Sequence, residues 1–584
     1  MWPTSMRERA NGRKSAYSIG AYERRVKKTL TVWRREGRVE RLWRGDAGLW
    51  TGGDEGRWVG WLHGVDRQLR LCGDLKRAAQ EVQEAGFEDV LLLGMGGSSL
   101  CAEVLSLTFG RVEGYPRLRV LDSTVPAQVR RFADGVDLEK TLCVVASKSG
   151  TTTEPNAFCD YFLEEMKQAV GERAGAHFGV ITDPGSPLEA RARKEGFGYA
   201  FEGVPEIGGR YSALSNFGMV PAAMMGIDVE AFLRRAARMV ARCGADVPAE
   251  KNPGVVLGVV LGELAAAGRD KVTLVTSPGI RGLGTWLEQL LAESTGKGGK
   301  GLVAVDNEPL GPPEVYGEDR LFVYIRLTVG YDPGQDEAVG ALERAAQPVV
   351  RVHLEDAMGL GGAFFLWEVA TAVAGCVLGV HPFDQPDVQE SKAFTARLMD
   401  DFEVEGRLPA EAPFLCDGGV QVFADGENAV ALAGAASLEV CLAAHLARLK
   451  PGDFAALCAY LDMNDQNRER LQAIRLRIRD SRGVATTVGY GPRFLHATGQ
   501  LHKGGPNSGL FLQITSDDAE DLPIPGSRAS FGTLKAAQAL GDALALSGRC
   551  RRTVRVHLSA GVEAGLRRLL WSVERAVQHM ERGA

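Results

Sequence analysis

The segment DVLLLGMGG (89–97) is an apolar run that ends in glycines, and the pattern recurs in TLCVVASKSG (141–150) and HFGVITDPG (177–185). Helical segments separate these runs. Continuous apolar strands that alternate with helices predict a parallel sheet covered on both faces. The fold class expected for residues 46–235 is therefore α/β.

The same pattern restarts twice further along the chain. A second α/β unit is predicted over residues 236–400, and a third over residues 401–584, after an acidic, turn-rich stretch. The strands of the second unit are expected at KVTLVTSPG (271–279), LFVYIRL (321–327) and PVVRVHL (348–354). Those of the third are expected at DFAALCAYL (453–461), ATTVGYGPRFL (485–495), GLFLQIT (509–515) and TVRVHL (553–558).

The third unit resembles the second in sequence. RVHLEDAMGLGGAFFLWEVATAV (351–373) is similar to RVHLSAGVEAGLRRLLWSVERAV (555–577), and residues 278–305 are similar to 491–514. Two matches in the same order predict an internal repeat, in which the third unit is a degenerate copy. The copy has no glutamate at the place of Glu293.

Composition narrows the class of protein. A chain of 584 residues is long enough for three or four domains, and a net charge of −6 argues against nucleic acid as the main partner. The ten cysteines form no C-x-x-C pair, as expected in a reducing cytoplasm. No apolar run reaches the ~18 to 20 residues of a membrane span, and the N-terminus lacks a signal-peptide core, so a cytoplasmic protein without membrane contact is expected.

Residues 1–45 are markedly basic and predict one helix. Tyr22, Val26, Leu30 and Val32 give this helix a partial apolar stripe. A packed or solvated lead-in helix is therefore favoured over an interaction arm.

TWLEQLLAESTGKGGKG (285–301) predicts an amphipathic helix that ends at Glu293, beside a glycine-lysine loop. A carboxylate placed next to mobile glycines could serve as a base toward a phosphorylated small molecule. The alternative is an ordinary charge at a helix end.

Two turns could hold the phosphate. GMGGSSL (94–100) follows a strand and opens a helix. SKSGTTTEPNAF (147–158) places Ser147, Ser149, Thr151 and Thr152 at a strand-to-helix turn, with Lys148 as a positive charge. No Walker motif is present, so nucleotide binding is not implied. The alternative for the second turn is a capped helix start.

Two further segments carry candidate site residues. GGRYSALS (208–215) presents Arg210, which could stabilise an enediolate or form an ion pair. In HPFDQPDVQESKAF (381–394), a helix starting at Pro386 would place Gln385 and Lys392 on one face, although Lys392 could be a surface lysine.

Together, in this order across residues 94–392, these segments resemble phosphoglucose isomerase, most of all the isomerase half of fused transaldolase/phosphoglucose isomerase proteins. LWTGGDEGRWVGWL (49–62) and GPRFLHATGQLHKGGPNSGLFLQI (491–514) are similar to that subgroup. The resemblance implies two sugar-isomerase (SIS) domains, each a parallel sheet flanked by helices, plus the C-terminal α/β unit. It implies interconversion of glucose 6-phosphate and fructose 6-phosphate without a cofactor or metal. It also leaves open a homodimer and a link to a separate transaldolase.

The resemblance also assigns roles to matching residues. Glu293 would move the proton between C1 and C2 through a cis-enediol, and Arg210 would stabilise that intermediate. Gln385 and Lys392 would lie near the ring oxygen and the C1 and C2 hydroxyls. The phosphate would be held by Ser98, Ser147, Lys148, Ser149 and Thr152.

The ring-opening histidine departs from the family pattern. Residues 297–352 hold no histidine, and His381 stands where relatives tend to have asparagine. His502, or alternatively His496, in HATGQLHKGG echoes the family's histidine segment but follows the D-Q segment. His502 is the expected residue, and a site without any histidine is the remaining alternative.

Two other functions stay open from sequence alone. The chain could isomerise both glucose and mannose phosphates, because the stereochemistry at C2 is read by details of the pocket. It could also be a non-catalytic regulator that binds sugar phosphates. Such a regulator would have no need for Glu293, Arg210 and Lys392 together.

Overall fold

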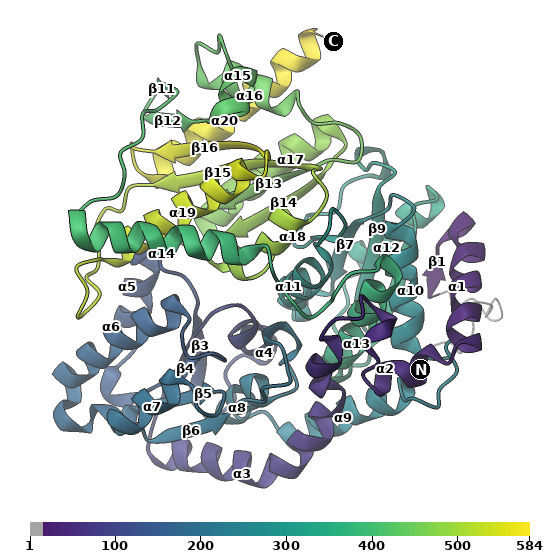
Figure 1. Cartoon of the computed structure of the whole chain (residues 1–584), viewed down its shortest axis with the longest axis vertical. Helices are drawn as coiled ribbons and strands as arrows, with labels where there is room; N and C mark the ends of the chain where they lie inside the picture. The colour runs from purple at the N-terminus through teal and green to yellow at the C-terminus, as the bar shows by residue number, and fades with distance from the viewer. Residues whose placement is uncertain (1–15, 584) are drawn as a thin grey trace.

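The computed structural model describes residues 16–583, and its three sheets correspond to the three units expected from the sequence (Figure 1). The first sheet is entirely parallel, with the order β3-β2-β4-β5-β6. Its strands are β2 (Asp89–Gly94), β3 (Arg117–Leu121), β4 (Thr141–Ala146), β5 (Phe178–Thr182) and β6 (Tyr199–Glu202). Strands β2, β4 and β5 are buried along their whole length, as expected for a sheet covered on both faces. The α/β fold class is confirmed.

The second sheet has the order β1-β10-β9-β7-β8, in which the edge strand β1 is antiparallel and the others are parallel. Its strands are β1 (Tyr17–Ser18), β7 (Lys271–Thr276), β8 (Val303–Val305), β9 (Arg320–Leu327) and β10 (Val349–Leu354). The helix α11 (Leu283–Thr295) connects β7 to β8 and carries Glu293 in its last turn.

The third sheet has the order β11-β12-β16-β15-β13-β14. Its parallel strands are β13 (Phe454–Ala459), β14 (Ala485–Tyr490), β15 (Gly509–Ser516) and β16 (Arg552–Leu558). The hairpin of β11 (Leu415–Asp417) and β12 (Val420–Phe423) extends it beyond β16. The parallel order β14-β13-β15-β16 is the order β8-β7-β9-β10 of the second sheet, with strands in the same chain sequence. The third unit therefore repeats the topology of the second.

The two sequence matches differ in how they fit this repeat. The RVHL tetrapeptides end the equivalent strands β10 and β16, which supports the first match. The second match is one strand out of step, because residues 278–305 link β7 to β8 whereas residues 491–514 follow β14 and end in β15. That part of the prediction is wrong. The two similar segments are instead neighbours in space, since α11 contacts α18 (Gly499–Gly504).

The helix α13 (Leu360–Leu378) corrects the expectation about apolar runs. Ala357–Leu378 is long enough for a membrane span and contains an 18-residue window with a mean hydropathy of 1.6, but 94% of that window is buried inside the protein. It packs against α9 (Val229–Arg242), α10 (Pro253–Ala265) and α11. A Cβ atom on Gly258 of α10 would lie 2.4 Å from the Ala370 carbonyl oxygen, so glycine permits this close packing. Among the described residues, this one span-like helix is a core helix.

The described part of the basic N-terminal segment forms two helices rather than one. The helices α1 (Glu23–Arg35) and α2 (Arg38–Trp43) are separated at Gly37, which has a φ of 58°. Val26, Leu30 and Trp33 are buried. The Thr29 hydroxyl donates to Glu263 of α10 at 2.6 Å. From residue 16 onward this segment is mainly helical and packed against α10, whereas residues 1–15 lie outside the described residues.

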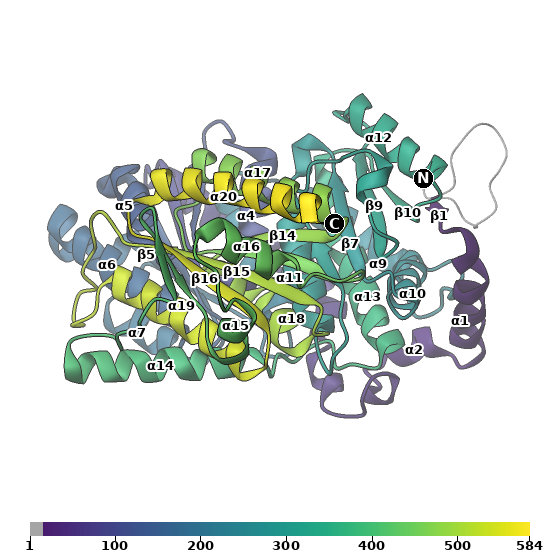
Figure 2. The ribbon, with the colours of Figure 1, turned by 90° about the horizontal axis from the view of Figure 1, so that it is seen from above.

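The third unit is docked on both of the others, as Figures 1 and 2 show from two directions. Leu522, Ile524 and Phe531 join the apolar core of the first unit. Val303 and Val305 of β8 share a core with Phe454 and Phe511 of the third unit. The helix α14 (Val388–Glu405), which leaves the second unit, packs along α19 (Phe531–Gly548) of the third. Loops of all three units can therefore meet at one place.

Candidate active site

Two turns of the first unit begin side by side. Gly94 and Ala146 are paired at the carboxyl ends of the adjacent strands β2 and β4. The turn after β2 forms the short helix η5 (Gly96–Ser98), and the turn after β4 runs from Ser147 to Thr152 before α6 (Thr153–Val170). Parallel sheets bind ligands at such carboxyl ends.

The hydroxyl groups of the turn after β4 bond within the turn and do not cap α6. Thr152 is the residue before α6, yet its side chain makes no capping bond to the helix, which argues against the alternative of an ordinary capped start. The Ser147 hydroxyl donates to Thr152 Oγ1 at 3.1 Å, and the Ser149 and Thr151 hydroxyls lie 2.9 Å apart. Hydroxyls at a helix N-terminus suit a phosphate.

Lys148 does not face this turn as expected. Its ammonium group donates to Asp183, to the Val204 carbonyl at 3.3 Å and to the Pro205 carbonyl at 3.2 Å. These three acceptors use all three N–H bonds of the group. Lys148 therefore ties the turn to the loops after β5 and β6, and the prediction that it contacts the phosphate is not supported.

Replacing Lys148 with methionine is expected to lower stability by about 1–3 kcal/mol, because Asp183 and two carbonyl oxygens lose their donor. The KM for a phosphorylated substrate should stay close to that of the wild type. Thermal unfolding and initial-rate kinetics measure the two effects. A large rise in KM at unchanged stability would instead return Lys148 to the phosphate.

The carboxylate of Glu293 lies in a ring of polar contacts and is 9% exposed. Its Oε2 accepts from Gln289 Nε2 at 3.0 Å, and its Oε1 lies 3.3 Å from Arg210 Nη1. Gln289 stands one turn earlier on the same face of α11, so helix spacing alone brings the two together. Gln289 Nε2 also donates to the backbone oxygen of His496 at 2.7 Å.

Arg210 is 3% exposed and is held by hydrogen bonds on all sides. Its Nε donates to Ser294 Oγ at 2.8 Å and its Nη1 donates to Gln385 Oε1 at 3.0 Å. Its Nη2 donates to the carbonyls of Pro382 and Asp384, each at 2.8 Å. The guanidinium is therefore fixed beside Glu293 before any ligand arrives.

Gln385 reaches this cluster, but not from a helix. The helix α14 begins at Val388, so Pro386 does not start it and Gln385 lies in the preceding turn. The prediction of a shared helix face is wrong because this turn is held by other groups. His381 Nδ1 accepts from the backbone N–H groups of Phe383 and Asp384, at 3.1 and 3.2 Å.

Lys297 fixes the same turn from the other side. Its ammonium lies 2.8 Å from Asp384 Oδ1 and donates to the carbonyls of Ser294, at 3.2 Å, and His381. Burial, and then the nearby Arg210 charge, lower the pKa of Lys297 to about 7. The turn that carries Gln385 is thus attached directly to the segment that carries Glu293.

The third unit contributes His496 to the site. Its ring Nε2 lies 3.0 Å from Glu154 Oε1, and Glu154 also accepts from Gln538 Nε2 at 2.6 Å. Burial alone would raise the pKa of Glu154, but His496 and, to a smaller extent, Lys392 outweigh it and lower that pKa. Lys392 itself is exposed on α14. A charged carboxylate therefore faces the imidazole.

Arg493 anchors the turn that carries His496. The two residues share the short helix η12 (Arg493–His496). Arg493 donates to both oxygens of Glu103, at 2.8 and 2.6 Å, and to Asp122 Oδ1 at 2.7 Å. Such a bidentate pair fixes both distance and orientation. His496 is therefore positioned against the first unit by a contact outside the site.

His502 does not reach the site, which corrects the expected assignment. Its ring lies among Phe454, Phe494 and Phe511, with centroid distances of 6.4, 5.9 and 5.0 Å. Burial holds the pKa of His502 well below its usual range, so the ring stays neutral. A histidine enclosed by phenylalanines serves the core of the third unit.

Gly97 in η5 allows the turn after β2 to pack closely against the segment that carries Arg210. A Cβ atom on Gly97 would lie 2.2 Å from the carbonyl carbon and oxygen of Gly209, next to Arg210. Gly97→Ala is therefore expected to push Arg210 out of place, with a loss of about 10²-fold in kcat.

Gly73→Ala is the matched control for this substitution. Gly73 lies in α3 (Gly64–Glu84), and a Cβ atom there would have nothing within 4 Å. This variant should keep full activity and gain up to about 1 kcal/mol in stability. Equal turnover in both variants, measured by initial rates, would refute the role of the close approach at Gly97.

Sequence reasoning missed Gln289 and Glu154 and ranked His496 second. Gln289 had a usable signal, since it precedes Glu293 by one helical turn. Glu154 had only a weak one, because an acidic residue in a first helical turn is common for electrostatic reasons. His496 could not be placed because its partner is 342 residues away in the chain.

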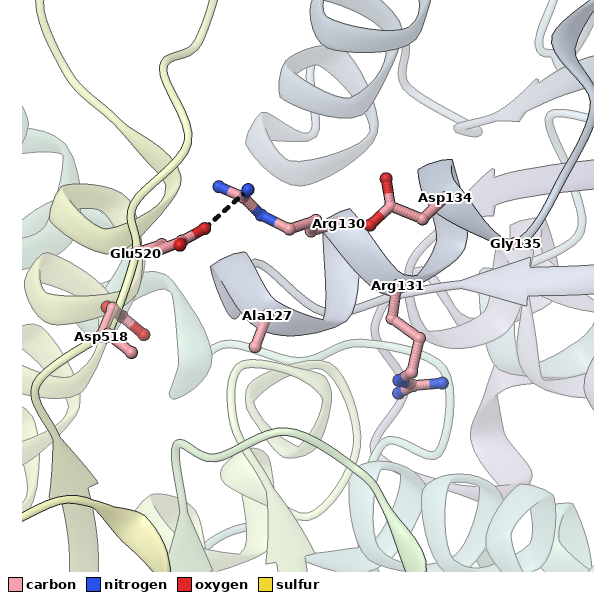
Figure 3. Close-up of a pocket in the computed structure, with 8 residues that line it drawn as sticks. Ala127, Arg130, Arg131, Asp134, Gly135, Asp518 and Glu520 are labelled. Carbon is pink, nitrogen blue, oxygen red and sulfur yellow. Dashed lines mark ion pairs between the residues drawn. The ribbon is translucent and has the colours of Figure 1, made fainter.

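Another cavity, of ≈580 Å³, lies away from this cluster, between α5 (Pro126–Asp134) and residues 518–520 (Figure 3). Figure 3 shows Arg130 directed toward Glu520, with 2.7 Å between their charged atoms. Arg131 is directed away from that pair and donates to Asp462 Oδ1 at 2.7 Å. Each arginine thus forms an ion pair between the first and the third unit. Little of their positive charge is left to bind a ligand.

Similar proteins, like the geometry of the site, indicate a sugar-phosphate isomerase. The family model for phosphoglucose isomerase matches residues 70–313, which include Ser98, Ser147, Arg210 and Glu293 but not His496. A glucose-6-phosphate isomerase of Rubrobacter xylanophilus is 31% identical over 374 residues, covering 55% of this chain and 84% of the relative.

Solved structures share the fold. A hypothetical protein of Thermus thermophilus has a TM-score of 0.55 and 26% identity, over 65% of this chain and 97% of that one. A glucose-6-phosphate isomerase of Chlamydia trachomatis has a TM-score of 0.50 and 18% identity, over 67% of this chain and 86% of that one. The expected SIS fold is confirmed. The chain matches this family's model and, at 31% identity, most of the length of the Rubrobacter relative. It therefore belongs to the phosphoglucose isomerase family.

Proposed function

We propose that this protein interconverts glucose 6-phosphate and fructose 6-phosphate, with Glu293 moving a proton between C1 and C2 through a cis-enediol. The observation that carries the proposal is the contact between Glu293 and the buried Arg210, 3.3 Å apart. A proton next to a carbonyl is weakly acidic. Its removal requires a positioned base and a cation where negative charge develops on oxygen, and the two residues supply both.

The surrounding contacts favour catalysis over simple binding. Arg210 is fixed by four hydrogen bonds, so it loses little freedom when the enediolate forms. Gln289 orients the carboxylate of Glu293 from the opposite side. A regulator that only recognised sugar phosphates would gain nothing from a base held in this way.

The phosphate would anchor the substrate at the turns after β2 and β4. Ser98, Ser147, Ser149 and Thr152 are the residues assigned to it, without Lys148. An anchor remote from C1 and C2 lets binding energy position the reacting carbons against Glu293. The reaction needs no redox cofactor, because one carbon loses a proton, its neighbour gains one, and the substrate is neither oxidised nor reduced overall.

Ring opening is assigned to His496. The imidazole would transfer a proton between the ring oxygen and the C1 hydroxyl, and the charged Glu154 would stabilise the imidazolium. Gln385 would lie near the same hydroxyls. Lys392 is exposed on α14 and near enough to lower the pKa of Glu154, so a role at the ring oxygen remains part of this proposal.

The third unit then completes the site within one chain. Gln289 of the same polypeptide donates hydrogen bonds to Glu293 and to the backbone oxygen of His496. Catalysis therefore requires no residue from a second subunit. Turnover per chain should therefore be independent of protein concentration. The proposed link to a separate transaldolase rests only on the resemblance to the fused proteins, and a cytoplasmic location rests on sequence.

A coupled assay with purified full-length protein tests the proposal. Fructose 6-phosphate should be converted to glucose 6-phosphate at a rate that saturates with substrate. Mannose 6-phosphate, offered in parallel, would reveal activity toward the C2 epimer. Binding of the sugar phosphate without any turnover would overturn the enzyme and favour a regulator.

A further inference from the structure

A cavity of ≈220 Å³ in the third unit lies outside the site described above. Its position follows from the sheet order β14-β13-β15-β16. The chain leaves β13 toward β14 on one side and leaves β15 toward β16 on the other, so the order reverses between β13 and β15. Ligands of open α/β sheets bind at the carboxyl ends of strands at such a point.

The cavity opens where that rule places it. Tyr460 follows β13 directly, Thr515 and Ser516 end β15, and His557 lies near the end of β16. The equivalent point of the first unit is the one between β2 and β4, which carries the proposed phosphate turns. The third unit thus has a cavity at the place where the first unit is proposed to hold a phosphate.

The polar groups of the cavity suit an anion. Lys535 is 3% exposed, and its ammonium donates to the Ser516 carbonyl at 3.1 Å and to Asp518 Oδ1 at 2.7 Å. Its third N–H bond has no partner among residues 16–583. Arg555 stacks over the Phe423 ring at 4.2 Å and gives one nitrogen to Glu411. Its other nitrogens have no partner within the same range.

Each cation at the cavity has one carboxylate partner. Lys535 pairs with Asp518, and Arg555 pairs with Glu411, which comes from an exposed stretch before β11. An anion would therefore bind through the N–H groups that these pairs leave over. The Thr515 hydroxyl, 3.0 Å from His557 Nδ1, adds a further polar group. Cations beside hydroxyls, partly removed from water, are the usual surroundings of a bound phosphate.

We propose that this cavity binds a small phosphate monoester as a second site, separate from the catalytic one. Its size suits a compact metabolite and excludes a nucleotide-sized ligand, because pockets for larger organic ligands span roughly 300–1,000 Å³. When the cavity is empty, Glu411 pairs with Arg555. The anion and Glu411 therefore compete for the Arg555 guanidinium. Arg555 and Lys535 make the contacts to the phosphate.

Inorganic phosphate is the probe that tests the second site. Equilibrium dialysis of the full chain at high protein concentration counts the phosphates bound per chain. The wild type should bind one phosphate at the catalytic turns and another in the cavity. Thr152→Val should lose the first and Arg555→Gln the second, while turnover in Arg555→Gln remains that of the wild type.

Arg552→Gln is the matched control. Arg552 lies on the same strand and also pairs with a carboxylate, Asp453, at 2.6 Å, but it is at the opposite end of β16. This variant should bind as much phosphate as the wild type. Glu411→Gln should bind phosphate more tightly in the cavity. An unchanged count in Arg555→Gln would overturn the proposal. A single phosphate that Thr152→Val keeps and Arg555→Gln loses would support the cavity and contradict the phosphate turns instead.

Discussion

Glu293→Gln is expected to lower kcat for fructose 6-phosphate by about 10²- to 10⁴-fold, with little change in KM. The amide keeps the shape of the carboxylate, and its one carbonyl oxygen can still face Arg210, while Gln289 loses an acceptor. Substrate binding should therefore be retained. What the amide loses is the ability to take up a proton at neutral pH. Initial rates with substrate titration, together with direct binding of fructose 6-phosphate, separate the two effects.

Glu288→Gln provides the matched control on the same helix. Burial, and then the nearby Asp306, raise the pKa of Glu288 to about 8, so this side chain is mostly protonated at neutral pH. An amide resembles a protonated acid, and the substitution should leave kcat nearly unchanged. If Glu293→Gln kept its turnover, or if both variants lost it equally, Glu293 would not be the base.

His496→Asn is expected to slow turnover of the cyclic substrates by about 10²-fold. The imidazole is the group that would exchange protons with the ring oxygen, whereas Glu293 acts only after the ring is open. An aldose phosphate too short to form a ring should therefore react at nearly the wild-type rate. Comparing the two substrate types by initial rates isolates the ring-opening step.

A substitution at His502 is the control for this prediction. His502→Leu removes the other histidine of the same segment, which lies among three phenylalanine rings. Its activity should stay close to the wild type, whatever happens to its stability. Loss of ring opening in His502→Leu, with His496→Asn unaffected, would contradict the assignment.

The fold could be predicted because its signals are local. Apolar runs that end in glycine mark β2, β4 and β7 directly in the sequence, and the parallel sheets follow from alternation with helices. The RVHL match at the ends of β10 and β16 also reported a true equivalence. The second match did not, because similar residues in α11 and α18 reflect neighbouring positions in space rather than equivalent strands.

The site could be predicted only in part, for a physical reason. Arg210 and Glu293 were found because each lies in a distinctive local segment, and the structure brings them to 3.3 Å. The direction of Lys148 is decided by Asp183, and the place of His496 by the contact of Arg493 with Glu103, 390 residues away. Such choices depend on how units dock, which local sequence does not reveal.

The most direct test of the central claim is conversion of fructose 6-phosphate in D₂O, followed by NMR of the product. We predict glucose 6-phosphate that carries deuterium at C2, because the proton held by Glu293 exchanges with solvent during the enediol stage. Glu293→Gln should slow both product formation and exchange by the same factor, about 10²- to 10⁴-fold. Bound substrate without turnover in the wild type, or deuterium incorporation in Glu293→Gln at the wild-type rate, would contradict proton transfer by Glu293.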